Sequence, residues 1–218
     1  MNGISAFIFD MDDTLAATSG LWRRAETEFL ESLGYAFTQE LASHYKGMNA
    51  LDVAATMHRL LGIAQPVEWC QQQLRERLFE AFRRGPLTAM PGADACLQRV
   101  RQAGPVALAS GSPLELIEMT LAQFGWRDAF TVVISSESVP RGKPSPDVFL
   151  AAAAALGKPA VECLVFEDSL VGVQAALNAE MACFAVPSSH PAEIAQRATR
   201  VFSSLGEVTV EDWIGLRK

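Results

Sequence analysis

The stretch Ala6-Phe7-Ile8-Phe9-Asp10-Met11-Asp12-Asp13-Thr14 places three carboxylates directly after an apolar run. The run predicts a buried strand, and unbalanced carboxylates at the mouth of such a strand are costly. A divalent cation with oxygen ligands would offset that cost. Asp10 and Asp12 are two residues apart, so on an extended backbone their side chains leave on the same side. This spacing suits a nucleophile beside a general acid and base, while an acidic strand-to-loop turn is the alternative.

Three later apolar runs also end in groups suited to a phosphate site. Residues 105–109 precede Ser110-Gly111-Ser112, whose small side chains let backbone N–H groups approach a ligand. Arg141-Gly142-Lys143-Pro144-Ser145-Pro146 holds a lysine on a restricted backbone. Residues 163–166 precede a second acidic pair, Glu167-Asp168. Each segment alone is an ordinary turn, but four strand ends carrying carboxylates, hydroxyl, lysine and carboxylates are hard to explain as turns.

The pattern from residue 93 onward predicts an α/β fold. Strands are expected at 4–9, 105–110, 131–134, 162–167 and 182–186, with helices at 93–103, 146–156 and 171–179. Another helix carries apolar residues at Leu114, Ile117, Leu121 and Phe124. Strands that alternate with helices indicate a mostly parallel, doubly wound sheet. Ligands bind outside the carboxyl ends of such strands, where the four polar segments lie.

Residues 16–86 have a different pattern, which predicts an inserted all-helical cap. Leu21, Ala25, Phe29 and Leu33 recur every four residues, as in an amphipathic helix, and Gly34 ends the run. Further helices are expected at 50–61 and 67–82. We therefore assign residues 1–15 and 87–218 to the core and 16–86 to the cap.

Composition narrows the class of protein. The chain has 218 residues, is 50% hydrophobic and carries a net charge of −7, which argues against nucleic acid or anionic membranes as partners. No apolar run approaches membrane-spanning length, and no basic segment with a long apolar stretch begins the chain. Four widely separated cysteines indicate free thiols in a reducing compartment. We expect a cytoplasmic protein, monomeric because no long exposed apolar stripe demands a partner.

Together these motifs resemble the haloacid dehalogenase superfamily. The matching segments are Asp10-Met11-Asp12-Asp13-Thr14, Ser110, Gly142-Lys143-Pro144-Ser145-Pro146-Asp147 and Glu167-Asp168-Ser169-Leu170-Val171-Gly172. The chain is most similar to the phosphoglucomutase-like branch, which has a helical cap. Within it, Ala109-Ser110-Gly111-Ser112-Pro113-Leu114 and Val201-Phe202-Ser203-Ser204-Leu205 resemble bacterial hexitol and 2-deoxyglucose-6-phosphate phosphatases. The resemblance implies a Rossmann-like core with a mobile helical cap, hinged near 16–18 and 86–91. It also implies magnesium-dependent hydrolysis of small sugar or polyol phosphates.

The resemblance also implies a role for each motif residue. Asp10 would attack phosphorus to form an aspartyl-phosphate, and Asp12 would act as general acid and then base. Mg²⁺ would contact Asp10, the backbone carbonyl of Asp12 and Asp168, with Glu167 either as a ligand or as a holder of magnesium-bound water. Ser110 and the backbone around Gly111 would bind a phosphate oxygen. Lys143 would balance the carboxylates and contact the transferring group.

Substrate specificity is expected from the cap. Trp22 matches a substrate-contacting position of similar sugar phosphatases, although packing in the cap core is an equal alternative. In His44-Tyr45-Lys46-Gly47-Met48-Asn49, which resembles the cap loop of this branch, Lys46 and Asn49 are expected to hydrogen-bond sugar hydroxyls. The mutases carry an arginine shortly after that glycine, where this chain has Ala50. Asp13 and Glu180 also depart from the family, standing where glycine is common.

Three alternatives remain at this stage. A sugar phosphomutase would need to retain a bisphosphate, which Ala50 and the replacement of a mutase histidine by Trp22 disfavour. A dehalogenase would need neither Asp12 nor a metal site at Asp168. A non-enzymatic sensor of phosphorylated metabolites would share the fold without the chemistry.

Overall fold

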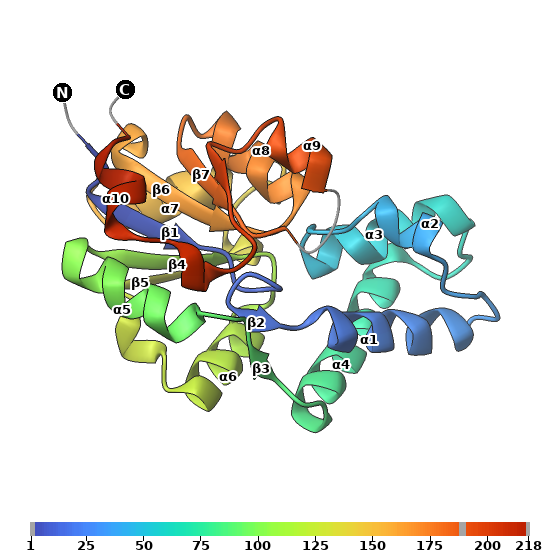
Figure 1. The fold of residues 1–218 in the computed structure, drawn as a ribbon. Coiled ribbons are helices and arrows are strands. Elements are labelled where there is room, and N and C mark those ends of the chain that lie inside the picture. Colours follow the sequence, from blue (N-terminus) through green and yellow to red (C-terminus); the bar gives the residue numbers. More distant parts are fainter. Residues whose placement is uncertain (1–2, 188–190, 217–218) are drawn as a thin grey trace.

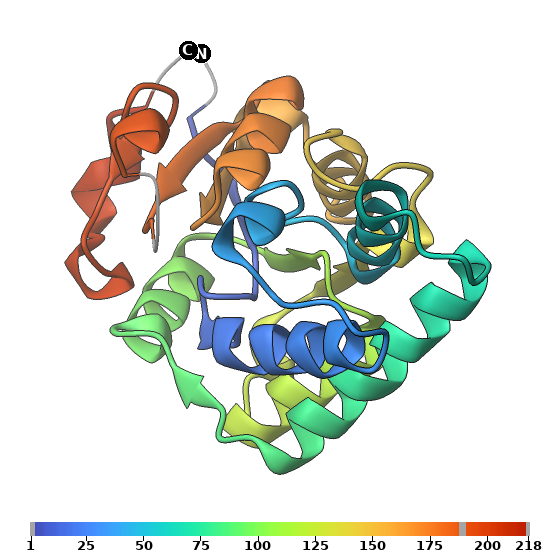
Figure 2. The same ribbon diagram turned by 90° about the vertical axis from the view of Figure 1, so that its right-hand side faces the viewer.

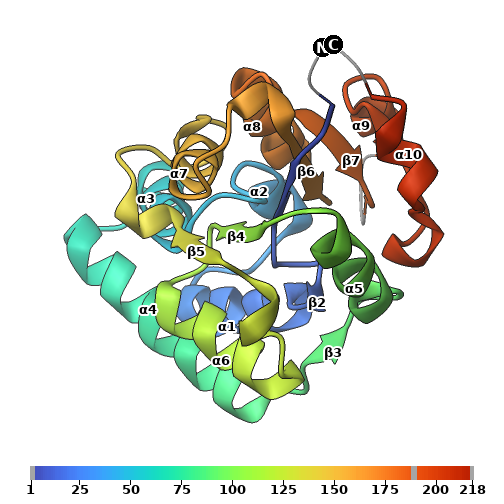
Figure 3. The same cartoon turned by 90° about the vertical axis from the view of Figure 1, so that its left-hand side faces the viewer.

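A parallel six-stranded sheet runs through the larger part of the computed structural model, which describes residues 3–187 and 191–216. The strands lie in the order β5-β4-β1-β6-β7-β8, and every neighbouring pair is parallel. Figure 3 labels β5, β4, β6 and β7 of this sheet. They are β1 (Ala6–Phe9), β4 (Val106–Ser110), β5 (Val132–Ser135), β6 (Cys163–Glu167), β7 (Ala182–Ala185) and β8 (Arg200–Val201). The predicted α/β fold with a mostly parallel sheet is confirmed, and β8 is an addition.

Helices cover both faces of this sheet because successive strand residues point to opposite sides. Phe7 and Phe9 of β1 join one buried cluster, and Ile8 joins the other. The first face carries α5 (Ala93–Ala103), α6 (Leu114–Phe124) and α10 (Val210–Ile214), while the second carries α7 (Asp147–Ala155), α8 (Leu170–Asn178) and α9 (Pro191–Ala195). Short 3-10 helices complete this part: η1 (Arg127–Ala129), η2 (Ser136–Ser138), η3 (Ala160–Glu162) and η4 (Leu205–Glu207). The doubly wound arrangement follows directly from strands that are buried on both faces.

The segment between β1 and α5 forms a separate helical layer (Figures 1 and 2). It contains α1 (Ser19–Glu31), α2 (Gln39–Ser43), α3 (Ala50–Leu61) and α4 (Val67–Arg84), which share their own buried cluster. Leu116 of α6 also belongs to that cluster, so the helical layer packs on the core. None of the helices in the described part of the chain combines the length and hydropathy needed to cross a bilayer.

A two-stranded antiparallel ribbon, which the sequence did not predict, joins the two places where the chain crosses between core and cap. In it β2 (Ala16–Ala17) pairs with β3 (Thr88–Ala89). The ribbon lies at the predicted hinges. The division into residues 1–15 with 87–218 and residues 16–86 stays a prediction.

Two residues that depart from the family pattern occupy left-handed backbone. Asp13 has φ +55° and Glu180 has φ +60°, a region that glycine enters at no steric cost. Both are positions where the resemblance led us to expect glycine. At both positions the chain adopts a backbone conformation that favours glycine while it carries a side chain.

Candidate active site

The four polar segments meet at one edge of the sheet. Asp10 follows β1, Ser110 ends β4 and Glu167 ends β6, and β1 pairs with both other strands. Because these strands are parallel, their carboxyl ends lie at the same edge, as expected for a doubly wound sheet. The loop containing Lys143 enters there after β5, and its side chain contacts Asp10 and Glu167. The structure thus brings together the residues that the sequence placed at separate strand ends.

A cavity of about 520 Å³ lies between this edge and the cap. That volume is in the range of small-molecule sites. Its core side is lined by Asp10, Asp12, Asp13, Gly111, Lys143, Glu167, Asp168 and Ser169. Its cap side is lined by Thr18, Ser19, Trp22, Arg23, Glu26, Phe37, Gln39, Ala42, Ser43, Tyr45, Lys46, Gly47, Met48 and Val53.

Lys143 lies between two carboxylates at the floor of the cavity. Its Nζ donates to Asp10 Oδ1 at 2.7 Å and to Glu167 Oε1 at 2.6 Å. Lys143, Asp10 and Glu167 are 3%, 4% and 1% exposed, so the contact is shielded from water. Charges in such a site interact more strongly than at the surface. Lys143 therefore holds the Asp10 carboxylate in a fixed position.

Glu167 is held against the first turn of α8. Its Oε2 accepts from the backbone N–H of Asp168 and of Ser169, both at 2.9 Å, and from Ser169 Oγ at 3.0 Å. A Cβ on Gly172 would lie 1.8 Å from Glu167 Oε1, so this position needs glycine. Both Glu167 oxygens are engaged with protein donors, and the positive end of α8 adds to their effect.

The cluster has more negative than positive charge. Oxygens of Asp10, Glu167 and Asp168 all lie within 4.8 Å of one another, and Lys143 forms ion pairs with Asp10 and Glu167. Burial raises the pKa of Asp10, Lys143 opposes this, and the Glu167, Asp12 and Asp168 carboxylates raise it further. Burial lowers the pKa of Lys143, but Asp10 and Glu167 outweigh it and raise the value above its usual range. These buried oxygens fit a hard divalent cation such as Mg²⁺.

Four donors from the core and the cap fix the Asp12 side chain. Its Oδ1 accepts from Thr18 Oγ1 at 2.7 Å and from Trp22 Nε1 at 3.1 Å. Its Oδ2 accepts from Ser110 Oγ at 2.9 Å and from Ser112 Oγ at 2.8 Å. Ser110 is fully buried behind Asp12 and is not among the described residues that line the cavity, whereas Gly111 is. Sequence reasoning missed Thr18 and Ser112, although Ser112 repeats the hydroxyl of Ser110 two residues later.

Asp13 connects the loop after β1 to the start of α1. Its Oδ1 accepts from the backbone N–H of Thr18 and of Ser19, both at 3.0 Å. These N–H groups begin α1 and have no partner within the helix. Asp13 thus supplies a helix cap from a distance of five residues, which glycine at this position would not do.

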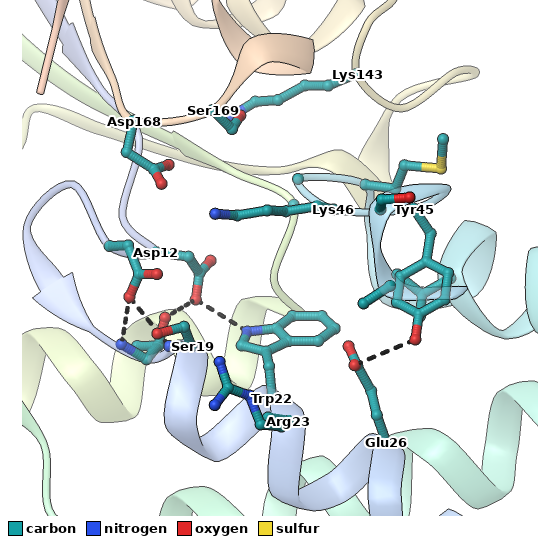
Figure 4. Close-up of a pocket in the computed structure, with 18 of the residues that line it drawn as sticks. Asp12, Ser19, Trp22, Arg23, Glu26, Tyr45, Lys46, Lys143, Asp168 and Ser169 are labelled. Carbon is teal, nitrogen blue, oxygen red and sulfur yellow. Dashed lines mark hydrogen bonds between the residues drawn. The ribbon is translucent and has the colours of Figure 1, made fainter. Parts of the chain in front are cut away.

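The predicted cap residues lie in two different environments. Trp22 and Lys46 line the cavity, and Lys46 extends across it on the side of Asp12 and Asp168 (Figure 4). Asn49 is 6% exposed and is not among the described lining residues. Its Oδ1 accepts from Asp52 N–H at 2.9 Å and its Nδ2 donates to Asp52 Oδ2 at 2.7 Å, so it caps α3. The predicted substrate contact of Asn49 stays a prediction, and its observed role is structural.

Glycines allow the cap to approach the core closely. A Cβ on Gly47 of the cap would lie 2.4 Å from Val171, and one on Gly142 of the core would lie 2.3 Å from Asn49. On another side, Arg75 of α4 forms ion pairs with Glu115 and Glu137 of the core. The helical layer therefore contacts the core on two sides of the cavity.

Comparison with known proteins identifies the family of the chain. The model of the family described as haloacid dehalogenase-like hydrolase matches residues 4–180. The chain belongs to the haloacid dehalogenase-like hydrolase family. The predicted superfamily, its fold and the assignment as a hydrolase are thereby confirmed.

Relatives of this hydrolase include proteins named as phosphatases. It is 34% identical over 230 residues to hexitol phosphatase B of Escherichia coli K12, covering 97% of each chain. It is 32% identical over 212 residues to the bifunctional riboflavin kinase/FMN phosphatase of Arabidopsis thaliana, covering 96% of this chain but 55% of that one. The crystal structure of CbbY from Rhodobacter sphaeroides with phosphate superposes with a TM-score of 0.82 at 27% identity, covering 97% of this chain and 99% of that one.

Proposed function

We propose that this hydrolase is a magnesium-dependent phosphatase of small sugar or polyol phosphate monoesters that works through an aspartyl-phosphate. The observation that carries the proposal is the buried Asp10, fixed by Lys143 at the floor of the cavity with Asp12 beside it. Relatives named as hexitol phosphatase and FMN phosphatase, and the phosphate bound by CbbY, support a phosphate monoester as the substrate.

The reaction divides between the two aspartates. Asp10 attacks phosphorus while Asp12 gives a proton to the departing alkoxide, and the alcohol leaves. Asp12 then takes a proton from water, which attacks the aspartyl-phosphate and regenerates Asp10 with release of inorganic phosphate. Lys143 contacts the transferring group as its charge develops. The closed cap keeps bulk water away during the first step.

Magnesium would be held by Asp10, Asp168 and the backbone carbonyl of Asp12. When bound, the cation supplies positive charge that offsets the repulsion between the Asp10 carboxylate and the phosphate. Glu167, whose oxygens are already engaged, is better suited to orienting Lys143 and a magnesium-bound water than to direct coordination. We also propose a cytoplasmic monomer.

Hydrolysis is favoured over phosphoryl migration. Ala50, which stands where the mutases are expected to hold a second phosphate, is buried in the cap and 2% exposed. The aspartate pair and the acidic cluster likewise argue against a dehalogenase, which needs neither Asp12 nor a metal site.

The test is phosphate release from a panel of hexitol and sugar phosphates, with and without Mg²⁺. Wild type is compared with Asp10→Asn and with Asp128→Asn, which changes an exposed aspartate away from the site. Magnesium-dependent release that Asp10→Asn alone abolishes supports the proposal. Interconversion of sugar phosphates with little free phosphate would replace it by a mutase, and ligand binding without any turnover would favour a sensor.

A further inference from the structure

One buried contact of Lys143 is made with an aromatic ring rather than with a carboxylate. The Nζ atom of Lys143 lies over the ring of Phe149, 4.9 Å from its centroid. Phe149 is fully buried and Lys143 is 3% exposed, so water does not screen the contact. The face of an aromatic ring carries negative potential, which attracts a cation within about 6 Å, most strongly where both groups are shielded from water. The ring therefore attracts the ammonium group directly.

The position of this ring is set by the segment that also carries Lys143. Pro144 and Pro146 restrict the backbone between the lysine and α7, and Phe149 lies in the first turn of that helix. Ala152 is buried one turn later on the same face of α7, and its small side chain lets the helix lie close to the sheet. The ring and the ammonium group thus belong to one short segment with a restrained backbone.

Phe149 is also the one aromatic residue of its buried cluster in the part of the chain that the structure describes. The cluster otherwise consists of alanine, valine, isoleucine, leucine, cysteine and methionine. The opposite face of the sheet holds aromatic rings that contact one another, among them Phe9 with Phe166 and Phe166 with Phe184. Because packing around Phe149 is made by aliphatic side chains, the property that distinguishes this residue is the negative face of its ring.

Lys143 has one N–H group left for a ligand. An ammonium group has three N–H donors, and two of them reach Asp10 Oδ1 and Glu167 Oε1. The third has no hydrogen-bond partner among the described residues, and Lys143 lines the cavity. At 4.9 Å the ring attracts the positive charge without accepting a hydrogen bond, so it restrains the ammonium group without occupying that donor.

We propose that Phe149 is a positioning residue, whose ring holds the ammonium group of Lys143 so that its third N–H meets the transferring phosphoryl group. The inference rests on the proposed function and adds to it a residue that is not among the described residues lining the cavity. A lysine side chain is long and flexible, whereas stabilisation by a fixed charge requires that the charge be in place before the reaction. The ring gives the ammonium group a third point of attraction besides the two carboxylates.

The test weakens the ring face while keeping the shape of the side chain. Phe149 is replaced, by site-specific incorporation, with phenylalanine analogues whose rings carry one or three fluorine atoms. Fluorine withdraws electrons from the ring face, and the ring stays apolar, so the variants should fold. Phe149→Leu would instead remove packing together with the ring. The same analogues at Phe184, which is fully buried and contacts the rings of Phe166 and Phe202, serve as the matched control.

We expect kcat for phosphate release to fall as fluorine content rises, by about 5- to 30-fold with three fluorine atoms at Phe149. This range corresponds to about 1–2 kcal/mol, the strength of a cation–π contact shielded from water. The series at Phe184 should stay within about twofold of wild type. The inference is overturned if kcat is the same for every ring at Phe149, or if the two positions respond alike.

A stability measurement separates this inference from the proposed function, because it needs no turnover. Tm is measured for the Phe149 analogue with three fluorine atoms in wild type and in the Lys143→Met background. If the ring holds the ammonium group, this analogue should lower Tm by about 2–8 °C in wild type and by less than about 1 °C in Lys143→Met. Equal shifts in both backgrounds would overturn the inference, whatever the activity. If wild type releases no phosphate but the two substitutions are coupled, the proposed function fails and Phe149 still positions Lys143.

Discussion

Replacing Lys143 by methionine tests the electrostatic account of the site. Methionine keeps most of the side-chain length and removes the charge. Asp10 and Glu167 then lose the cation that contacts them at 2.7 Å and 2.6 Å, in a place where all three residues are at most 4% exposed. The variant would thus carry two neighbouring buried carboxylates without a counter-ion.

The expected loss of stability is large for a single substitution. Removing one partner of a buried ion pair costs about 3–5 kcal/mol. For a chain of this size each kcal/mol lowers Tm by about 2–4 °C, so Tm should fall by roughly 6–20 °C. The raised pKa of Lys143 means that its stabilisation is fully present below the unfolded-state value of about 10.4 and is lost only as the pH rises through the higher folded-state value. The gap between wild type and variant should therefore persist through neutral pH and close at strongly alkaline pH.

Thermal unfolding followed by circular dichroism measures this gap, with Lys158→Met as the matched change at a partly exposed lysine. Added Mg²⁺ should restore part of the lost stability in Lys143→Met, because a dication between the carboxylates replaces some of the missing charge. The electrostatic account is refuted if Lys143→Met melts within about 2 °C of Lys158→Met. It is also refuted if Mg²⁺ stabilises neither wild type nor variant.

Three further outcomes follow from the structure. Asp13→Gly relieves about 1–2 kcal/mol of left-handed strain but loses two hydrogen bonds worth about 1.5–3 kcal/mol each. Chemical denaturation should therefore show a net loss of about 1–5 kcal/mol, and a smaller one for Asp13→Asn. Gly172→Ala displaces Glu167 and should lower kcat by about 100-fold or more in steady-state assays. Gly215→Ala is the matched control, because a Cβ there meets no atom within 4 Å, and its kcat should equal that of wild type. The pKa of Glu26 is near its usual value in the unfolded chain and about 7 in the folded one, so folding favours the protonated form. The free energy of unfolding should therefore fall by up to about 3 kcal/mol as the pH rises from about 5 to 8. In denaturation curves measured over this pH range, Glu26→Gln should show a weaker dependence on pH.

Much of the core could be predicted because parallel strands buried on both faces have a recognisable hydrophobic pattern in the sequence. They appear as short continuous apolar runs, and β1, β4, β5, β6 and β7 each lie within two residues of their predicted bounds. The strands β2, β3 and β8 escaped prediction because two residues are too few to show any periodicity. Their pairing depends on which distant segment lies beside them.

The convergence of Asp10, Lys143, Glu167 and Asp168 was also predictable, since the topology of the sheet forces its carboxyl ends together. The detailed contacts of Asp12 were not, because two of its donors come from the cap and depend on how the cap closes. Motif spacing locates a residue along the chain, while a hydrogen bond between core and cap depends on packing between elements.

The cap loop shows what local chemistry could have added. Asn49 and Asp52 are three residues apart at the start of an apolar-periodic segment, which is the spacing of a helix N-cap with an acidic N3 partner. That pattern competes with the family-based expectation that Asn49 contacts substrate, and in the structure the capping contacts engage both atoms of its amide. For a polar residue that lies near both a binding site and a helix terminus, a capping role is therefore the first hypothesis to test.

Helix α1 connects two parts of the cavity within about one turn. Trp22 and Glu26 are four residues apart, so they lie on the same face of the helix and both line the cavity. Trp22 Nε1 donates to Asp12 Oδ1, and Glu26 Oε2 accepts from Tyr45 Oη. Because both side chains belong to one helix, a shift of α1 relative to the core would move the donor to Asp12 and the Glu26–Tyr45 contact together. The position of α1 therefore determines both the hydrogen bonding of Asp12 and the shape of the cavity around Glu26.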